Sequence, residues 1–242
     1  MKLLKKERKL LLEGKTKKIY TSDNPCEVII HYKDDITSFN GLKKNVIPDK
    51  GILNNEITTF IFNLLNRYGI KTHFIRKMNN REQLCHKVNM FPLEFVVRNI
   101  VAGSISKRLG IKEGTPILNP IFEIFYKNDH LKDPLINDHH AVFLNVISHK
   151  ELSNIYCIIS NINNKLKKFF FDRNIILVDF KMEFGKGKKD NQIFLSDEIS
   201  PDTCRFWDKE TMNKLDKDIF RIGLKKEKII DVYMEVLKRL NK

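Results

Sequence analysis

The sequence predicts an α+β fold of two lobes, with a mostly antiparallel sheet in the first lobe and a mixed α/β second lobe. Apolar and polar residues alternate in short segments of the first half, and such alternation is typical of half-buried strands. Apolar residues recur at helical spacing over long stretches of the second half. A chain of 242 residues is long enough to bury the cores of two modest lobes. We place the boundary near residues 88–91, which gives a first lobe of residues 1–88 and a second of residues 89–242.

Short strands and one helix are expected in the first lobe. The helix is predicted because apolar residues recur at spacings of three and four from Ile57 to Tyr68. Asn54 or Asn55 is expected to cap its start. Gly69 is expected to end it in a left-handed conformation. The predicted strands are Leu10–Glu13, Lys17–Thr21, 27–33, 72–77, 83–89 and 93–100.

Two long helices and a hairpin are expected in the second lobe. Ser148 and Glu151 have the spacing of a capping box, which predicts the start of a helix whose apolar face continues to Phe170. A hairpin is expected from a strand at 175–184 and a return strand at 192–199, and a terminal helix is expected at 229–240.

The composition is that of a soluble globular protein, with 42% hydrophobic and 31% charged residues. Charged residues interrupt every apolar run near the start, so neither a signal peptide nor a membrane span is expected. The four cysteines have no disulfide-like or zinc-like spacing, which favours reduced thiols in a cytoplasmic protein.

The formal net charge of +14 is compatible with nucleic acid, a membrane surface or small polyanionic substrates. The lysines are spread along the whole chain instead of forming a stripe, which favours a solvated lysine-rich surface. Charge alone therefore does not decide the function.

A cluster of carboxylates is expected at the predicted hairpin. Alternate side chains of a strand face opposite sides, so one face of its first strand would carry Asp179, Lys181 and Glu183. The return strand would bring Asp197 and Glu198 beside them. Crowded carboxylates repel one another unless cations share the site, and Mg²⁺ is a hard cation that prefers oxygen ligands. The opposite face would be wholly apolar and consist of Ile176, Val178, Phe180, Met182 and Phe184.

Basic segments offer candidate sites for anions. Gly14 is expected to form a turn that lets backbone amides approach phosphate, and Lys15 and Lys17 add positive charge. The segment is not a Walker A motif, because it lacks the earlier glycine that this motif requires. Arg98 and Ser104 flank a turn of small residues that can build an anion pocket, although an arginine paired with a surface carboxylate would give the same pattern.

The polar loop before the single tryptophan is a third candidate. It places acidic residues, a proline turn and Arg205 close together in the sequence, beside large apolar residues. Such a density of polar groups is unusual for a simple connection between strands.

These segments belong to a longer series of short motifs. In order they are GKTKKIY at 14–20, DITSFNG at 35–41, GILNN at 51–55, FVVRN at 95–99, AGS at 102–104, RLG at 108–110, KND at 127–129, DFKMEFG at 179–185, and DEISPD at 197–202 followed by Arg205. In order and spacing they resemble the phosphoribosylaminoimidazole-succinocarboxamide synthase (SAICAR synthetase) family from end to end. The sequence is therefore identified as a member of that family.

The resemblance implies a two-lobed fold like those of kinases and ATP-grasp enzymes, with ATP between the lobes. It also implies an ATP-dependent ligase of purine biosynthesis, which joins a carboxyaminoimidazole ribonucleotide to L-aspartate through an acyl phosphate and releases ADP and phosphate. Mg²⁺ is the implied cofactor. A cytoplasmic homodimer without nucleic-acid or membrane partners is the implied assembly.

The resemblance also implies roles for individual residues. Glu183 and Asp197 would hold Mg²⁺, and Lys181 would stabilise phosphoryl transfer. The nucleotide would be bound by Gly14, Lys15 and Lys17 at its phosphates and by residues 87–90, which include Lys87 and Met90, at its adenine. Contacts to the other substrates would come from Arg98, Ser104, Asp179 and Arg205 for the ribonucleotide and from Lys127, Asp129 and the loop 35–41 for aspartate.

That loop departs from the common form of the family. It has Phe39 where a small residue is frequent and Asn40 where an acidic residue is frequent, which weakens its implied role.

Three alternatives stay open at this stage. A nucleic-acid-binding protein would explain the charge but predicts exposed aromatic residues, whereas most of the 17 phenylalanines lie at core-periodic positions. A protein kinase would require HRD and DFG elements, which the sequence lacks. An inactive nucleotide-binding relative would not need the carboxylates that this chain retains.

Overall fold

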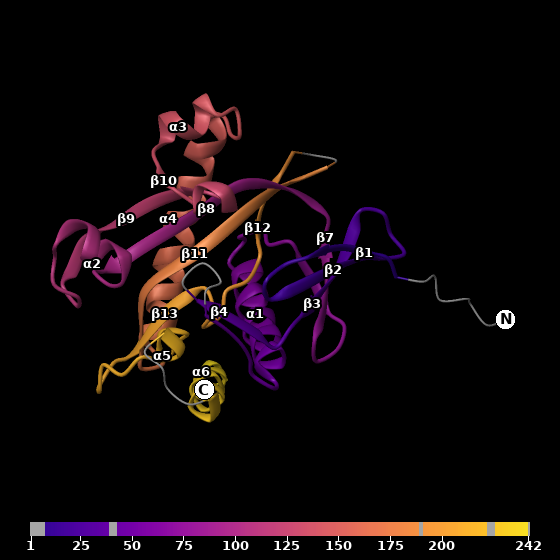
Figure 1. Ribbon diagram of the computed structural model, residues 1–242. Coiled ribbons are helices and arrows are strands. Elements are labelled where there is room, and N and C mark those ends of the chain that lie inside the picture. The colour runs from indigo at the N-terminus through magenta and orange to yellow at the C-terminus, as the bar shows by residue number, and fades with distance from the viewer. Residues whose placement is uncertain (1–7, 39–42, 189–190, 222–225, 242) are drawn as a thin grey trace.

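Two antiparallel sheets and the helices between and around them form the fold, as the computed structural model shows (Figure 1). The structure describes residues 8–38, 43–188, 191–221 and 226–241. The predicted α+β class is confirmed.

The first sheet comes from the N-terminal part of the chain, and its strands lie in the order β1-β2-β3-β7-β6. Its strands are β1 (Leu10–Glu13), β2 (Lys17–Thr21), β3 (Glu27–Tyr32), β6 (Phe74–Lys77) and β7 (Glu82–His86). The predicted strands are confirmed, except that the strand expected at 83–89 is divided at Lys87, where the chain passes into the second sheet. A separate hairpin is formed by β4 (Asp35–Ser38) and β5 (Lys43–Val46).

The second sheet is built around β11 (Ile175–Gly187), which pairs with β8 (Val88–Ile100) on one edge. On its other edge β11 pairs with β12 (Ile193–Ser196) near its end and with β13 (Cys204–Asp208) near its beginning. The segment 197–203 therefore joins two strands that share one edge of β11 and bridges the gap between them. The sheet continues beyond β8 with β9 (Pro116–Tyr126) and β10 (Leu135–Ile136).

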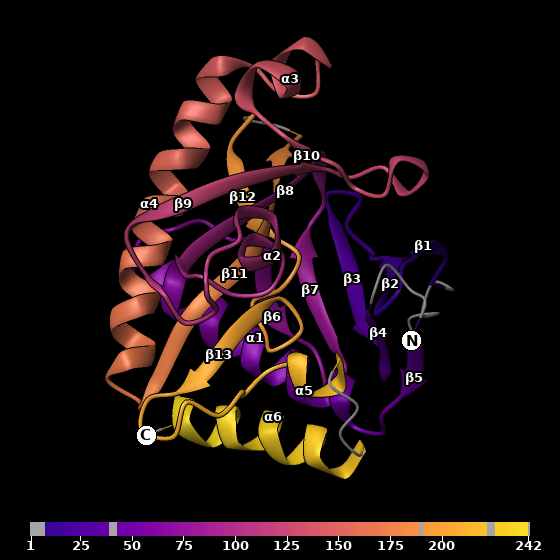
Figure 2. The same ribbon diagram turned by 60° about the vertical axis from the view of Figure 1, so that its left-hand side comes forward.

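Helices cover these sheets, and their packing is seen most clearly in Figure 2, where α4 stands beside the second sheet and α6 crosses beneath α1. They are α1 (Lys50–Arg67), α2 (Ser104–Leu109), α3 (Asp138–Phe143), α4 (His149–Phe171), α5 (Asp218–Arg221), α6 (Lys226–Leu240) and a 3₁₀ turn at Asp129–Leu131. Ser148 and Glu151 form the predicted capping box at the start of α4.

One large core joins elements from both sides of the predicted lobe boundary. Ile61 of α1, Phe95 of β8, Ile159 of α4 and Phe180 of β11 all belong to it, and none of these side chains is more than 1% exposed. The chain changes sheets at Lys87, close to the predicted boundary, but the shared core ties α1 to the second sheet. The division into residues 1–88 and 89–242 stays a prediction.

The start of α1 differs from the prediction, since the helix begins at Lys50 and not near Asn54 or Asn55. Asp34, which lies just after β3, supplies the missing cap: its Oδ1 accepts a hydrogen bond from the amide of Gly51 at 2.9 Å. A cap supplied from outside the helix leaves no local signal in the sequence. The predicted end is confirmed, because Gly69 has a φ of 78° directly after the helix.

The predicted apolar face of β11 is divided by a bulge. The register with β13 shifts between Leu177 and Asp179, so that side chains on the two sides of the shift face different surroundings. Phe180, Met182 and Phe184 lie in the large core, whereas Ile176 and Val178 pack in a separate cluster with Trp207. The prediction of one continuous apolar face is therefore wrong.

None of the helices in the part of the chain that the structure describes is long and apolar enough to cross a membrane.

Close packing at Gly51 gives a testable prediction. A Cβ atom at this position would lie 2.6 Å from the backbone oxygen of Tyr32, so Gly51→Ala forces the start of α1 away from β3. We expect Gly51→Ala to lower the free energy of unfolding by roughly 3 kcal/mol in urea denaturation. Gly69→Ala is the control: its Cβ would meet no atom within 4 Å, so only left-handed strain of roughly 1 kcal/mol remains. An equal cost for both variants would contradict the packing argument.

Candidate active site

Partly buried carboxylates gather where β11 meets the segment that follows β12. Glu183 pairs in register with Ser196, and Asp197 is the next residue along the chain. Asp197 has a φ of 62°, a conformation that is uncommon for residues other than glycine. The backbone therefore turns sharply at this residue, directly beside Glu183.

Lys17 reaches this cluster from β2 of the first sheet. Its Nζ forms ion pairs with Asp197 and with Glu198, the latter at 2.7 Å from Oε1. The side chain is only 12% exposed. Burial would lower the pKa of Lys17, but the two carboxylates outweigh it and hold that pKa well above its ordinary value. Lys17 therefore stays charged and links the two sheets across the site.

Glu183 is less well neutralised than its neighbours. Lys127 Nζ lies 2.5 Å from its Oε1, at the end of β9. Burial, and then the charge of Asp197, nevertheless raise the pKa of Glu183 to about 7. Burial acts in the same direction on Asp197, but Lys17 outweighs it and lowers the pKa of Asp197. The site thus holds more negative charge than its lysines balance.

Lys181 does not pair with the carboxylates of its own hairpin. Its Nζ lies 2.6 Å from Glu94 on β8, the strand beside it. The sequence reasoning missed Glu94, although a lone acid between Leu93 and Phe95 in an apolar strand was a usable signal. The Lys181–Glu94 pair lies beside Glu183, because Glu183 and Glu94 face each other in the register of β11 and β8.

Asp179 belongs to a second charged cluster, which corrects the expectation of one set of carboxylates. Arg98 Nη1 lies 2.7 Å from its Oδ2, and Arg205 Nη1 lies 2.8 Å from the same oxygen. The two arginines take the place of the cation that crowded carboxylates would otherwise need. Ser104 joins this cluster, since its Oγ accepts a hydrogen bond from Arg98 at 3.1 Å.

Two further acids that the sequence reasoning missed orient these arginines. Glu123 of β9 lies 2.9 Å from Arg98 Nη2, and Asp218 of α5 lies 2.8 Å from Arg205 Nε. Glu123 is a single acid within an apolar strand, and this pattern in the sequence could have identified it as a candidate site residue. Asp218 is part of a short helix whose approach to β13 could not be read from the sequence.

Gly103 makes room for Arg205. Its φ is 63°, and a Cβ atom there would lie 2.5 Å from Arg205 Nη2. Glycine is thus required at this position for both its conformation and its small size. Arg98, Ser104, Asp179 and Arg205, all predicted from separate segments, are brought together by this packing.

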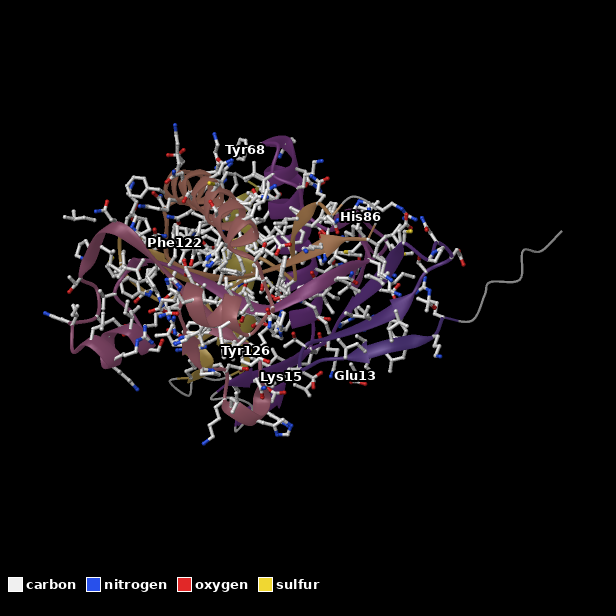
Figure 3. All side chains as sticks on the ribbon, turned by 90° about the horizontal axis from the view of Figure 1, so that it is seen from above. Glu13, Lys15, Tyr68, His86, Phe122 and Tyr126 are labelled. Atoms are coloured by element: carbon white, nitrogen blue, oxygen red, sulfur yellow. The ribbon has the colours of Figure 1, made fainter. Side chains whose placement is uncertain are left out.

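The predicted phosphate-binding turn lies at the edge of the site. The amide of Gly14 donates a hydrogen bond to Lys17 O at 2.8 Å and closes the turn between β1 and β2. Lys15 and Asp129 face each other at 3.4 Å, and both side chains are more than half exposed. Figure 3 shows Lys15 near Tyr126, the last residue of β9. The turn therefore lies against the segment that carries Lys127 and Asp129.

Residues 87–90 lead from β7 of the first sheet into β8 of the second sheet. The amide of Lys87 donates a hydrogen bond to Cys26 O at 2.8 Å. Met90 is 43% exposed and pairs in register with Gly185 of β11. A Cβ at Gly185 would lie 3.1 Å from Met90 Sδ, so the methionine packs closely over β11.

The donor atoms of the carboxylate cluster suit a hard cation. Among the described residues no group of three or more His, Cys, Asp or Glu side chains is arranged to hold a metal ion by itself. Glu183 and Asp197 nevertheless offer adjacent oxygen ligands with unbalanced negative charge. Mg²⁺ is commonly bound by one or two carboxylates together with phosphate oxygens, so two carboxylates are sufficient.

The predicted loop 35–41 is only partly covered by the structure. Asp35 lies 3.6 Å from Lys33 Nζ at the start of β4. Phe39 and Asn40 lie outside the described residues.

Comparisons with known proteins agree over nearly the whole chain. The sequence profile of the SAICAR synthetase family matches residues 10–240. A phosphoribosylaminoimidazole-succinocarboxamide synthase from Fusobacterium nucleatum is 58% identical over 232 residues, which cover 96% of this chain and 97% of that protein. The crystal structure of the enzyme of the same name from Ehrlichia chaffeensis has a TM-score of 0.93 at 47% identity and covers 96% of this chain and 98% of its own. A SAICAR synthetase in complex with ADP has a TM-score of 0.90 at 46% identity, with 97% of each chain covered.

The raised pKa of Glu183 predicts a pH-dependent stability. In the folded protein this carboxyl binds its proton more tightly than in the unfolded chain, where its pKa is near 4.5. Its contribution to stability is therefore present below about pH 4.5 and is lost as the pH rises towards 7. In the absence of divalent cations, we expect Glu183→Gln to raise the free energy of unfolding at pH 8 by roughly 1–3 kcal/mol, and by much less at pH 5.

A second glutamate provides a control of opposite sign. Burial would raise the pKa of Glu151, but hydrogen bonds from Lys186 and Ser148 outweigh it and lower that pKa. Glu151→Gln should therefore destabilise the protein at pH 8. Urea denaturation of both variants at the two pH values is the measurement, and a loss of stability at pH 8 in Glu183→Gln would contradict the proposed charge imbalance.

Proposed function

Because this chain belongs to the SAICAR synthetase family, we propose how its own residues perform the ATP-dependent ligation of that family. The chain is an ATP-dependent ligase of purine biosynthesis. The finer assignments, which are L-aspartate as the amine, Mg²⁺ as the cofactor and a role for each site residue, are proposals. The observation that carries them is the partly buried carboxylate pair of Glu183 and Asp197, which lies beside Lys17 and Lys127.

The chemistry explains why such a site is needed. An amine does not attack a free carboxylate usefully, because the carboxylate is negatively charged and its oxygen is a very poor leaving group. Attack of a carboxylate oxygen on the γ-phosphorus forms an acyl phosphate and releases ADP. The aspartate amine then attacks the acyl carbon, the bond to the phosphate oxygen breaks, and the nitrogen loses a proton. The protein contributes mainly positioning and charge neutralisation.

The nucleotide lies at the junction of the two sheets in this proposal. The turn at Gly14 and the charge of Lys15 would cover the phosphates, and Lys17 would lie beneath them. Lys17 is well suited to this role because Asp197 and Glu198 fix its position and keep it charged. Residues 87–90, which include Met90, would contact the adenine. The ADP complex of a similar protein supports nucleotide binding in this fold.

Glu183 and Asp197 would hold Mg²⁺, which when bound neutralises charge on the phosphate groups. Lys181 and Lys127 lie on two sides of Glu183, each already oriented by an acid. These lysines would stabilise the negative charge that shifts between oxygen atoms during phosphoryl transfer.

The ribonucleotide would bind at the second charged cluster, with its phosphate facing Arg98, Arg205 and Ser104. Acids behind the arginines fix their planar groups, and preoriented arginines bind phosphate with two hydrogen bonds at once. Asp179 would hold the two arginines together beneath the ligand.

Aspartate would bind near Lys127 and Asp129, at the mouth of the site. Asp129 faces Lys15, so a ligand there would lie next to the nucleotide turn. A homodimer in the cytoplasm is the expected assembly and location.

The function is tested by following ADP release in a coupled assay with Mg-ATP, the carboxylated imidazole ribonucleotide and L-aspartate, with each left out in turn. We expect release to require all three. Release that continues without aspartate would show that the amine is assigned wrongly. No release from folded protein in any mixture would contradict the ligase activity.

The carboxylate pair gives the sharpest mutational prediction. We expect Glu183→Ala and Asp197→Ala each to lower kcat at least ~10²-fold, because each removes a ligand of the proposed cation, whose charge stabilises phosphoryl transfer. Glu210→Ala removes an exposed carboxylate just after β13, whose last residue pairs with Ile175 at the other end of β11 from Glu183, and should keep the wild-type kcat. Steady-state kinetics of the three variants is the measurement, and near-normal turnover of either site variant would remove the metal assignment.

A further inference from the structure

A buried polar stripe runs along α1, outside the sites described above. Lys50, Asn54 and Thr58 are spaced by four residues, so they share one face of the helix. Each is at most 1% exposed, although a helix face directed at a protein core usually carries apolar residues. The stripe therefore calls for a specific explanation.

All three side chains contact the segment 197–203. Lys50 Nζ lies 2.5 Å from Asp202 Oδ2, and Asn54 Nδ2 donates a hydrogen bond to the same oxygen at 2.9 Å. Thr58 donates a hydrogen bond from its hydroxyl to Ile199 O at 3.3 Å. Tyr233 of α6 donates its hydroxyl hydrogen bond to the other oxygen of Asp202 at 2.8 Å. Two helices thus hold one carboxylate.

Asp202 is linked in turn to the carboxylates of the site. Its amide donates a hydrogen bond to Ser200 Oγ at 3.1 Å, and Ser200 donates from that hydroxyl to Glu198 Oε2 at 2.6 Å. Glu198 pairs with Lys17 beside Asp197. A continuous series of hydrogen bonds therefore runs from Lys50 to the site.

The segment needs such support because it lies between the two ladders on this edge of β11. β12 ends at Ser196 and β13 begins at Cys204. Between them the backbone lies outside both ladders and accepts hydrogen bonds from Lys181 N to Thr203 O at 2.9 Å and from Lys217 N to Pro201 O at 3.0 Å. Arg205, by contrast, lies within the ladder of β13 and β11 and is held there.

Stability alone does not explain the pair. A buried ion pair is often no more stabilising than apolar residues of similar size, because both charges lose their hydration. Methionine could fill the place of Lys50 in the core. The ion pair of Lys50 and Asp202 is costly to bury, but its hydrogen bond has a fixed direction. It therefore holds the segment 197–203 in a single position.

We propose that Lys50, acting through Asp202, is a positioning residue that holds Asp197 and Glu198 in register with Lys17 and Glu183. The inference rests on the proposed function of those carboxylates in binding the nucleotide with its cation. It assigns no catalytic contact to Lys50, which lies behind the site.

Three variants test this role: Lys50→Met, Asp202→Asn and the two together. Each single change removes one charge of the buried pair, so it should lower the melting temperature. The double variant removes both charges and should regain part of the stability, because Lys217, whose charge also acts on Asp202, stays in place. We expect kcat to fall about 10²-fold in Lys50→Met and to stay low in the double variant. A regained melting temperature does not return Asp197 and Glu198 to their positions, because the ion pair that held the segment is still missing. The KM for the ribonucleotide should not change, since Arg205 is held by its own strand.

Binding provides a readout that is independent of turnover. Calorimetry of ADP with and without Mg²⁺ should show that the cation strengthens ADP binding in the wild type and does so much less in the double variant. Arg239→Met is the matched control, because it breaks an ion pair of 2.7 Å between α6 and Asp208 of β13, away from this segment. It should lower stability and leave both ADP affinities unchanged.

Recovery of kcat together with stability in the double variant would overturn the proposal, as would an unchanged effect of Mg²⁺ on ADP binding. If Glu183→Ala lowers turnover while the folded Lys50 variants keep wild-type kinetics, the positioning role is wrong and the roles of the carboxylates stand. If Glu183→Ala and Asp197→Ala also keep turnover, the proposed function of the cluster fails with it.

Discussion

Charge balance at the junction of the two sheets is the constraint on which the site depends. Glu183, Asp197 and Glu198 lie together, with side chains that are 16%, 31% and 3% exposed, and the ion pairs that the described residues make with them come from Lys17 and Lys127. Burial is the main cause of the raised pKa of Glu183, and the charge of Asp197 adds to it, because three carboxylates face only two lysines in these ion pairs. A site of this kind is suited to a cation, and in the proposed function a nucleotide that arrives with a divalent ion would supply it.

The architecture of β11 separates two charged clusters along one strand. Its bulge near Val178 places Asp179 among arginines, while Glu183 lies farther along among lysines and carboxylates. The arginine cluster is internally balanced by acids and presents oriented donors, as suits a fixed phosphate group. The carboxylate cluster is unbalanced, as suits a cation and a phosphoryl group in transfer. One strand thus holds both sites at a fixed distance from each other.

Local signals in the sequence predicted the fold class, most strands and the capping box of α4, because these depend on neighbouring residues. The start of α1 was not predictable, since Asp34 caps it from outside the helix. The pairing of Lys17 with Glu198 and the burial of Lys50 depend on contacts between segments far apart in the chain, which periodicity does not reveal. The motif resemblance located most candidate site residues, and the structure added the acids that orient them, such as Glu94.

Crystals grown with ADP and Mn²⁺, a cation whose anomalous scattering can be measured, test the central claim most directly. We expect an anomalous peak at about 2.0–2.4 Å from carboxylate oxygens of both Glu183 and Asp197, with phosphate oxygens completing its coordination. A peak that contacts phosphate oxygens but neither carboxylate would contradict the account, because the charge imbalance of the site would then have another purpose.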